Sequence, residues 1–216
     1  FRRVLFRSAD ELTQAIANAT ADVTIFLGDN ITGNATAVQK ENVKVTIIGN
    51  QKTYNGAIIV DGKSKRYATA GLTIQNISFS AENISEPAYI NLGKSGDGNT
   101  RYTNNVTVKD CTFSTTSTKD VAAVKSYTGG DWNLNISGCT ANEGMHSMLQ
   151  VANVEKGLKI VDCKVYSKNG VNLNNTPALE MSGCTFDTKG YAVRIGVNGN
   201  TNNGVFNISN STLKSN

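Results

Sequence analysis

The chain has 216 residues and a formal net charge of +4; 39% of its residues are hydrophobic and only 18% are charged. Three of the 21 basic residues lie within the first eight positions, and the other 18 nearly balance the 17 acidic residues. No basic run occurs, which argues against a nucleic-acid partner. No apolar stretch reaches the roughly 18 residues that a membrane-spanning helix needs, so no membrane span is expected.

The first eight residues, FRRVLFRS, have no counterpart elsewhere in the sequence. We therefore expect residues 1–8 to be a non-native or disordered leader, and residues 9–216 to form one domain. No polar cap follows the last repeat, and solenoids normally need one. We therefore expect this domain to be truncated at its C-terminus.

The segment Ser8–Asn18 is predicted to form a short helix. Ser8 and Glu11 have the spacing of a capping box, and Leu12 and Ile16 share one apolar face. A helix at this point would cover the open edge of the first strands.

Alternating apolar and polar residues predict β-strands along the rest of the chain. The first are expected at Asp22–Thr32, with a break at Gly28–Asn30, and then at Asn42–Asn50 and Gly56–Gly62. From position 71 onwards one pattern returns: apolar, polar, apolar, polar, then Asn, Asp or Gly, then usually Cys, a polar residue and an apolar residue. Its copies begin at Gly71, Asn105, Asn133, Gly157, Ala178 and Val205.

Each copy has an Asn, Asp or Gly at the point where the alternation is reset. These residue types best tolerate a left-handed backbone conformation. One such residue turns the chain without a long loop, so a second short strand is expected directly after it. The turn positions are Asn76, Asp110, Gly138, Asp162, Gly183 and Asn210.

Successive turn positions are 34, 28, 24, 21 and 27 residues apart. Such a repeat length is typical of solenoids and propellers, but most copies are too short for the four strands of a propeller blade, and no leucine-rich consensus occurs. The predicted fold is therefore all-β: a single-stranded parallel β-helix with three sheets and a short N-terminal capping helix. The third strand of each coil is expected at Ala88–Leu92, Val121–Lys125, Ser147–Val151, Gly170–Leu173 and Tyr191–Val197.

The four cysteines all occupy the position after the turn. A ladder of buried thiols that pack as small hydrophobic groups is the favoured interpretation. A disulfide between neighbouring coils stays open, and so does zinc, although the spacings are too wide for a Cys-x-x-Cys site. The four residues are Cys111, Cys139, Cys163 and Cys184.

The order of a short helix, the strand VTIFLGDNIT and the segments VTIIGN, GAIIVDG and LTIQNISF resembles the right-handed parallel β-helix superfamily, which includes pectate lyases, polygalacturonases and bacterial surface proteins. The resemblance covers nearly the whole chain. It implies a right-handed coil, a secreted or cell-surface location, and binding or cleavage of polysaccharides along one sheet.

Catalytic residues of these enzymes have few counterparts in this sequence. Pectate lyases hold calcium with several acidic residues on one outer face and use a basic residue as the catalytic base. Here that face offers only Glu180, and Arg194 stands in a partial match to a polygalacturonase motif. Calcium needs about 6–8 oxygen ligands, so no cofactor is expected; Asp97-Gly98-Asn99 leaves calcium binding open.

The only histidine, His146, suggests two further arrangements. Glu143 and His146 have the spacing of half a metal site, and Ser147, His146 and Asp131 form a triad on paper. Because neighbouring residues of a strand point to opposite faces, the triad is disfavoured.

Two long loops, Gly93–Asn104 and Tyr127–Trp132, carry the aromatic residues best placed to stack on sugar rings: Tyr102, Tyr127 and Trp132. Two functions follow. The favoured one is a non-catalytic module of a secreted or cell-surface protein, an adhesin, a stalk or a binder of a polysaccharide or host glycan. The alternative is a polysaccharide lyase or glycoside hydrolase.

Overall fold

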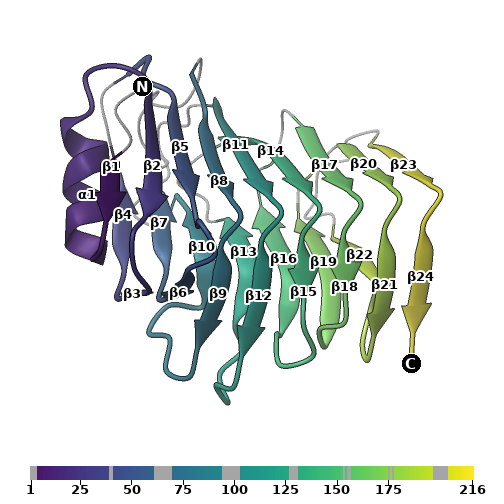
Figure 1. Cartoon of the computed structure of the whole chain (residues 1–216). Helices are drawn as coiled ribbons and strands as arrows, with labels where there is room; N and C mark the ends of the chain where they lie inside the picture. Colours follow the sequence, from purple (N-terminus) through teal and green to yellow (C-terminus); the bar gives the residue numbers. More distant parts are fainter. Residues whose placement is uncertain are drawn as a thin grey trace.

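The computed structural model describes residues 4–38, 41–60, 70–93, 103–126, 131–152, 154, 157–174, 176, 178–196 and 204–216. These residues form a parallel β-helix whose coils stack from α1 at one end to β24 at the other (Figure 1). Each full coil contributes one strand to each of three sheets, and all the strand pairs of the described residues are parallel. The predicted fold class is confirmed.

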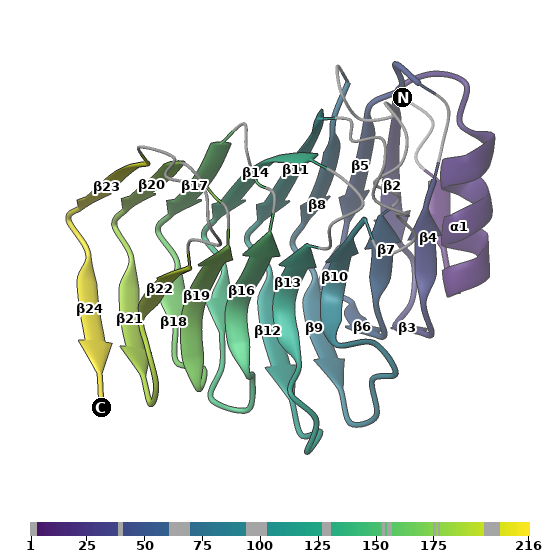
Figure 2. The same ribbon diagram turned by 180° about the vertical axis from the view of Figure 1, so that it is seen from behind.

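Among the described residues the three sheets contain nine, eight and seven strands, and we name them A, B and C. Sheet A contains β1 (Val4–Phe6), β2 (Val23–Leu27), β5 (Val45–Ile48), β8 (Leu72–Gln75), β11 (Thr103–Lys109), β14 (Asp131–Ser137), β17 (Gly157–Val161), β20 (Ala178–Ser182) and β23 (Val205–Ser209). Sheet B contains β3 (Ile31–Thr32), β6 (Thr53–Asn55), β9 (Ser78–Ala81), β12 (Thr112–Thr115), β15 (Thr140–Ala141), β18 (Lys164–Val165), β21 (Thr185–Thr188) and β24 (Thr212–Ser215). Sheet C contains β4 (Ala35–Ala37), β7 (Ile58–Val60), β10 (Ala88–Leu92), β13 (Ala122–Ser126), β16 (Ser147–Ala152), β19 (Asn169–Asn174) and β22 (Val193–Gly196), and it faces the viewer in Figure 2.

The turn from sheet A to sheet B is made by the residues that the repeat predicts. All six adopt a left-handed backbone conformation, as Asn, Asp and Gly do most readily. Their φ angles are 57° at Asn76, 52° at Asp110, 60° at Gly138, 53° at Asp162, 65° at Gly183 and 47° at Asn210. A single residue therefore makes the turn in each of these coils, and sheets A and B stay in register from coil to coil.

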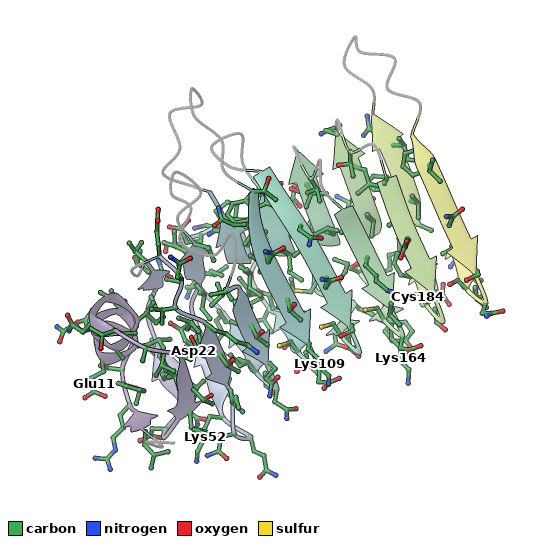
Figure 3. The ribbon with its side chains drawn as sticks, turned by 90° about the horizontal axis from the view of Figure 1, so that it is seen from above. Glu11, Asp22, Lys52, Lys109, Lys164 and Cys184 are labelled. Atoms are coloured by element: carbon green, nitrogen blue, oxygen red, sulfur yellow. The ribbon has the colours of Figure 1, made fainter. Side chains whose placement is uncertain are left out.

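The interior is filled by columns of equivalent apolar residues. On sheet B the rings of Phe79 and Phe113 stack with their centroids 5.2 Å apart and their planes within 5°. The four cysteines are free and at most 1% exposed, which confirms the ladder of buried thiols. Each Sγ lies 3.3 Å from the carbonyl oxygen two residues before it, so the thiols have hydrogen-bond acceptors. Lys109 and Lys164 are exposed, in contrast to the buried Cys184 (Figure 3).

The helix α1 (Ala9–Asn18) covers the N-terminal edge of sheet C, as predicted. Ser8 Oγ accepts a hydrogen bond from the Glu11 N–H, and Glu11 in turn accepts one from the N–H of Arg7. On the inner face Leu12 and Ile16 are fully buried. Thr13 accepts a hydrogen bond from a backbone N–H of β4, so the helix satisfies a donor of that edge strand.

Part of residues 1–8, the segment that we expect to be a non-native or disordered leader, lies in sheet A. Val4–Phe6 forms β1 and pairs in parallel with β2, with Val4 opposite Ile25 and Phe6 opposite Leu27. Three apolar residues in a row show no alternation, so β1 could not be recognised without its partner strand.

The third strands lie where the spacing predicts them, with ends shifted by at most two residues at the described positions. Besides β1, the short strands β4 and β6 have no counterpart in the prediction. No helix in the described residues is long and apolar enough to cross a membrane.

Candidate ligand-binding groove

The two residues predicted as weak catalytic candidates are not brought together. Glu180 lies on β20 in sheet A, between Lys159 and Asn207 in register, and its carboxylate is 3.7 Å from the Lys159 ammonium. Arg194 lies on β22 in sheet C, with its guanidinium 5.9 Å from the centroid of the Tyr191 ring. Burial raises the pKa of Tyr191, and the Arg194 charge opposes the rise. Because they sit on different sheets, Glu180 and Arg194 do not form one site.

Of the three aromatic residues predicted to stack on sugar rings, the structure describes Trp132, and Tyr102 and Tyr127 lie outside the described residues. Trp132 is fully buried and belongs to the hydrophobic core. It lies in β14 two residues before the buried Leu134, so the strand directs both side chains to the interior. The expectation that Trp132 offers an exposed ring is therefore wrong.

The disfavoured triad of Ser147, His146 and Asp131 is not assembled. Asp131 lies on β14 in sheet A, whereas Ser147 is buried on β16 in sheet C. His146 instead has its Nδ1 atom 2.8 Å from a carboxylate oxygen of Asp120. Among the described residues, no three or more His, Cys, Asp or Glu side chains are grouped to hold a metal ion. The segment Asp97-Gly98-Asn99 lies outside the described residues.

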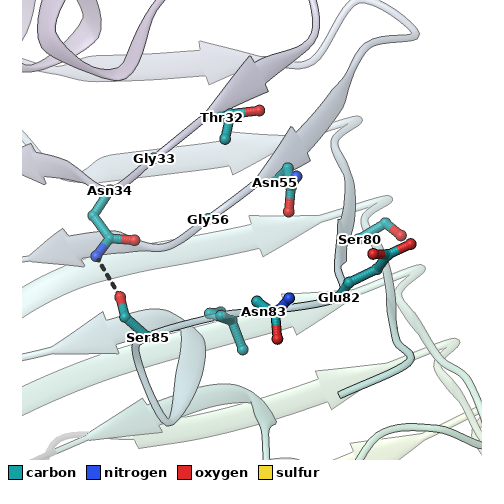
Figure 4. A pocket seen from close by; sticks show the side chains of 10 residues that line it. Thr32, Gly33, Asn34, Asn55, Gly56, Ser80, Glu82, Asn83 and Ser85 are labelled. Atoms are coloured by element: carbon teal, nitrogen blue, oxygen red, sulfur yellow. Dashed lines mark hydrogen bonds between the residues drawn. The ribbon is translucent and has the colours of Figure 1, made fainter.

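A cavity lies along the row of connections that lead from sheet B to sheet C, which we name the B–C corner. It has a volume of about 650 Å³ and spans the first three coils (Figure 4). We name it the corner groove. Its polar lining side chains are Thr32, Asn34, Asn55, Ser80, Glu82, Asn83 and Ser85.

The floor of the corner groove depends on two glycines in neighbouring coils. A Cβ atom at Gly56 would overlap with the carbonyl oxygen of Gly33, so only glycine lets the two backbones approach this closely. Gly33 itself has a φ angle of 106°, which favours glycine as well. Asn34 fixes the same turn by accepting a hydrogen bond from the N–H of Ala57 at 3.0 Å.

The wall of the corner groove is the segment 82–87, which joins β9 to β10 and reaches back over the earlier coils (Figure 4). Ile84 anchors it in the core with 2% exposure. Glu86 is also buried and accepts a hydrogen bond from Asn91 at 3.2 Å. At one end Asn34 Nδ2 donates to Ser85 Oγ at 3.1 Å, which ties the wall to the first coil. The wall is thus held at both its core and its outer edge.

The chemistry of the corner groove is that of amides and hydroxyls. Asn55 and Asn83 each offer two donors and an acceptor oxygen, and the hydroxyls of Thr32 and Ser80 both donate and accept. Glu82 supplies a carboxylate that accepts only. All five side chains are exposed. The groove therefore provides dense hydrogen bonding to a polar uncharged ligand, with one negative charge.

The corner groove could not be recognised in the sequence because its parts are far apart in the chain. Asn34 and Ser85 are separated by 51 residues. The Asn-Gly pair at positions 55 and 56 and the polar residues of segment 80–85 are visible in the sequence, but nothing there shows that the two segments lie side by side. Comparisons with models of protein families, with curated proteins and with solved structures found no match.

Proposed function

We propose that this protein is a non-catalytic glycan-binding module of a secreted or cell-surface protein, such as an adhesin or a stalk. The corner groove is its binding site. The observation that carries this proposal is the lining of the groove, in which amide and hydroxyl side chains surround a cavity of about 650 Å³. Its size is in the range of small-ligand sites, roughly 300–1,000 Å³.

The ligand class follows from matching donors to acceptors. A sugar presents neighbouring hydroxyls that each donate and accept, as do the side chains of Asn55, Asn83 and Ser80. A site built for hydroxyls discriminates against ligands that lack them, because its own polar groups would be left unpaired. Apolar ligands are therefore disfavoured.

We further propose that the chain belongs to the pectate-lyase-like branch of right-handed parallel β-helix proteins, and that it comes from a bacterial surface or secreted protein. The three-sheet coil and the capping helix α1 support this assignment.

The test is a glycan array followed by calorimetric titration of the strongest ligand. The double variant Asn55→Ala/Glu82→Gln should weaken binding by roughly tenfold or more, since each lost hydrogen bond is worth about 0.5–1.5 kcal/mol. The matched control is Asn207→Ala/Glu180→Gln, which removes the same groups from sheet A and should leave binding unchanged. Equal loss in both variants would contradict the proposal.

The enzymatic alternative has its own readout. Incubation with uronate polymers, with and without calcium, should yield no unsaturated or reducing products. Product formation that disappears in Glu180→Ala or Arg194→Ala would favour the polysaccharide lyase or hydrolase and overturn the non-catalytic assignment.

A further inference from the structure

A second cavity lies farther along the B–C corner. It has a volume of about 260 Å³ and is built by the connections after β12, β15, β18 and β21. These connections follow those of the corner groove in one row along the lower edge of Figure 1. We name it the lysine pocket, after Lys119, Lys168 and Lys189, which line it.

Backbone hydrogen bonds hold the levels of the lysine pocket in register. The N–H of His146 donates to Val121 at 2.8 Å, and the N–H of Lys168 donates to Met145 at 3.0 Å. The N–H of Gly190 donates to Lys168 at 2.7 Å. Successive coils are therefore about 4.8 Å apart here, the normal strand spacing. Three lysine residues, from the connections after β12, β18 and β21, thus line one small cavity.

The lysine pocket has more positive than negative side chains, with three lysines and two carboxylates. Two carboxylates face it, Asp120 and Glu143, and Asp120 is engaged by His146 at 2.8 Å. His146 is largely buried, with 16% of its side chain exposed, and Asn169 lies 3.4 Å from its other ring nitrogen. Within the described residues, none of the three lysines has a carboxylate within 4.0 Å. The lysines are therefore available for an anion.

We propose that the lysine pocket binds a tetrahedral oxyanion, a sulfate or phosphate group, carried by the same sugar chain that fills the corner groove. This inference rests on the proposed function for the rest of the ligand. The centres of the two cavities are three to four coils apart, roughly 14–19 Å at about 4.8 Å per coil. The ligand is accordingly an oligosaccharide that runs along the B–C corner with an anionic substituent several sugar rings from its other end.

The type of cation selects the type of anion. A planar carboxylate is best matched by the flat fork of arginine, whereas lysine acts as a point charge with three rotatable donors. The lysine pocket contains lysines from three levels and no arginine. Lysines that stand on different levels can donate to several oxygens of a tetrahedral group, which suits them better than the two oxygens of a planar carboxylate.

The experiment is calorimetric titration with a sulfated galactan oligosaccharide, its desulfated form, and a form with carboxylates in place of sulfates. The wild-type chain should bind the sulfated form about fivefold to tenfold more tightly than the other two, as expected for charge-assisted hydrogen bonds. The variant Lys168→Gln/Lys189→Gln should lose this preference and keep its affinity for the desulfated form.

The control variant is Lys109→Gln/Lys164→Gln, which removes two exposed charges outside the pocket and should keep the preference. Sulfate ions should compete with the sulfated ligand more strongly than chloride at equal ionic strength. Equal affinity for the sulfated and desulfated forms, equal affinity for the carboxylated form, or equal loss in the control variant would overturn the inference.

The two proposals fail separately in this experiment. If the desulfated form binds and Asn55→Ala/Glu82→Gln weakens its binding, the corner groove is supported as the binding site, whether or not the lysine variants change the affinity. If the desulfated form does not bind while binding of the sulfated form requires Lys168 and Lys189, the lysine pocket is supported as an anion site and the corner groove is rejected as a glycan site.

Discussion

Asn34 Nδ2 donates a hydrogen bond to Ser85 Oγ at 3.1 Å and so joins the first coil to a segment 51 residues later. This contact closes one end of the corner groove (Figure 4). Asn34 also accepts a hydrogen bond from the backbone of Ala57, whereas Ser85 ties only the outer edge of a wall that Ile84 already anchors in the core. Removing the Asn34 side chain would therefore break both hydrogen bonds, whereas removing the Ser85 hydroxyl would break only the one between them.

Ser85→Ala should weaken ligand binding by about threefold to tenfold, because it releases the outer edge of the wall by removing one hydrogen bond of about 0.5–1.5 kcal/mol. The free energy of unfolding should change by less than about 0.5 kcal/mol, since the bond is exposed. Calorimetry and urea unfolding measure the two quantities. Ser78→Ala, an exposed serine on β9 outside the groove, is the control; binding that is insensitive to Ser85→Ala would remove the wall from the site.

The A–B turn predicts a specific cost at Gly138. Its φ angle is 60°, and an alanine there would be strained by about 1–2 kcal/mol. Its Cβ would also overlap with a carboxylate oxygen of Asp110 in the preceding coil. Gly138→Ala should lower the free energy of unfolding by about 1–3 kcal/mol, whereas Asp162→Asn in the same column should be nearly neutral. Equal urea midpoints for the two variants would contradict the turn assignment.

The stacked rings of sheet B predict the cost of losing core volume. Phe113 is fully buried and packs against both Phe79 and Tyr89. Phe113→Ala should cost about 3–5 kcal/mol of unfolding free energy, and Phe113→Leu clearly less. Urea unfolding of the two variants tests this. A loss below about 1 kcal/mol for the alanine would mean that the column is not packed as described.

The thiol ladder predicts a fall in stability at high pH. The hydrogen bond with Cys111, together with burial, raises the pKa of Cys139 to about 12 from an ordinary value of 9.0. The hydrogen bond with Cys139, together with burial, likewise raises the pKa of Cys163 to about 12. Since the folded state then keeps protons that the unfolded chain releases, this stability is present below about pH 9 and is lost as pH rises towards about 12.

The measurement is urea unfolding from about pH 8 to about pH 10.5. The free energy of unfolding should fall by up to about 1.4 kcal/mol per pH unit for each thiol. The variant Cys139→Ala/Cys163→Ala, less stable at every pH, should show a shallower fall. In the native protein the four thiols should also resist alkylation until the chain unfolds. A parallel fall in both proteins, or rapid alkylation of the native state, would contradict the buried ladder.

Much of the coil could be predicted because one signal repeats. The alternation around Val106 and Val108, followed by a turn residue such as Asp110, fixes two strands and the inward direction of Cys111 in a single pattern. Repetition over six copies outweighs the ambiguity of any one strand. Short strands without a copy, such as β4 and β6, carry too few residues for the same inference.

The site could not be predicted in this way. Trp132 shows the limit: counted back from Leu134, the alternation already directs it inwards, but a loop assignment obscured this. The partners of His146 and of Asn34 depend on how many residues each connection contains, because the loop lengths decide which side chains meet at a corner. A repeat pattern records what the coils share, and the corner groove is built from what they do not share.

A nuclear magnetic resonance titration with the strongest glycan of the array tests, residue by residue, whether the ligand lies along the B–C corner. Backbone and side-chain amide signals of Asn55, Asn83 and their neighbours should shift, and those of Lys168 and its neighbours should shift as well for a sulfated ligand. Shifts confined to sheet A around Lys159, Glu180 and Asn207, with the corner unchanged, would show that the ligand lies elsewhere.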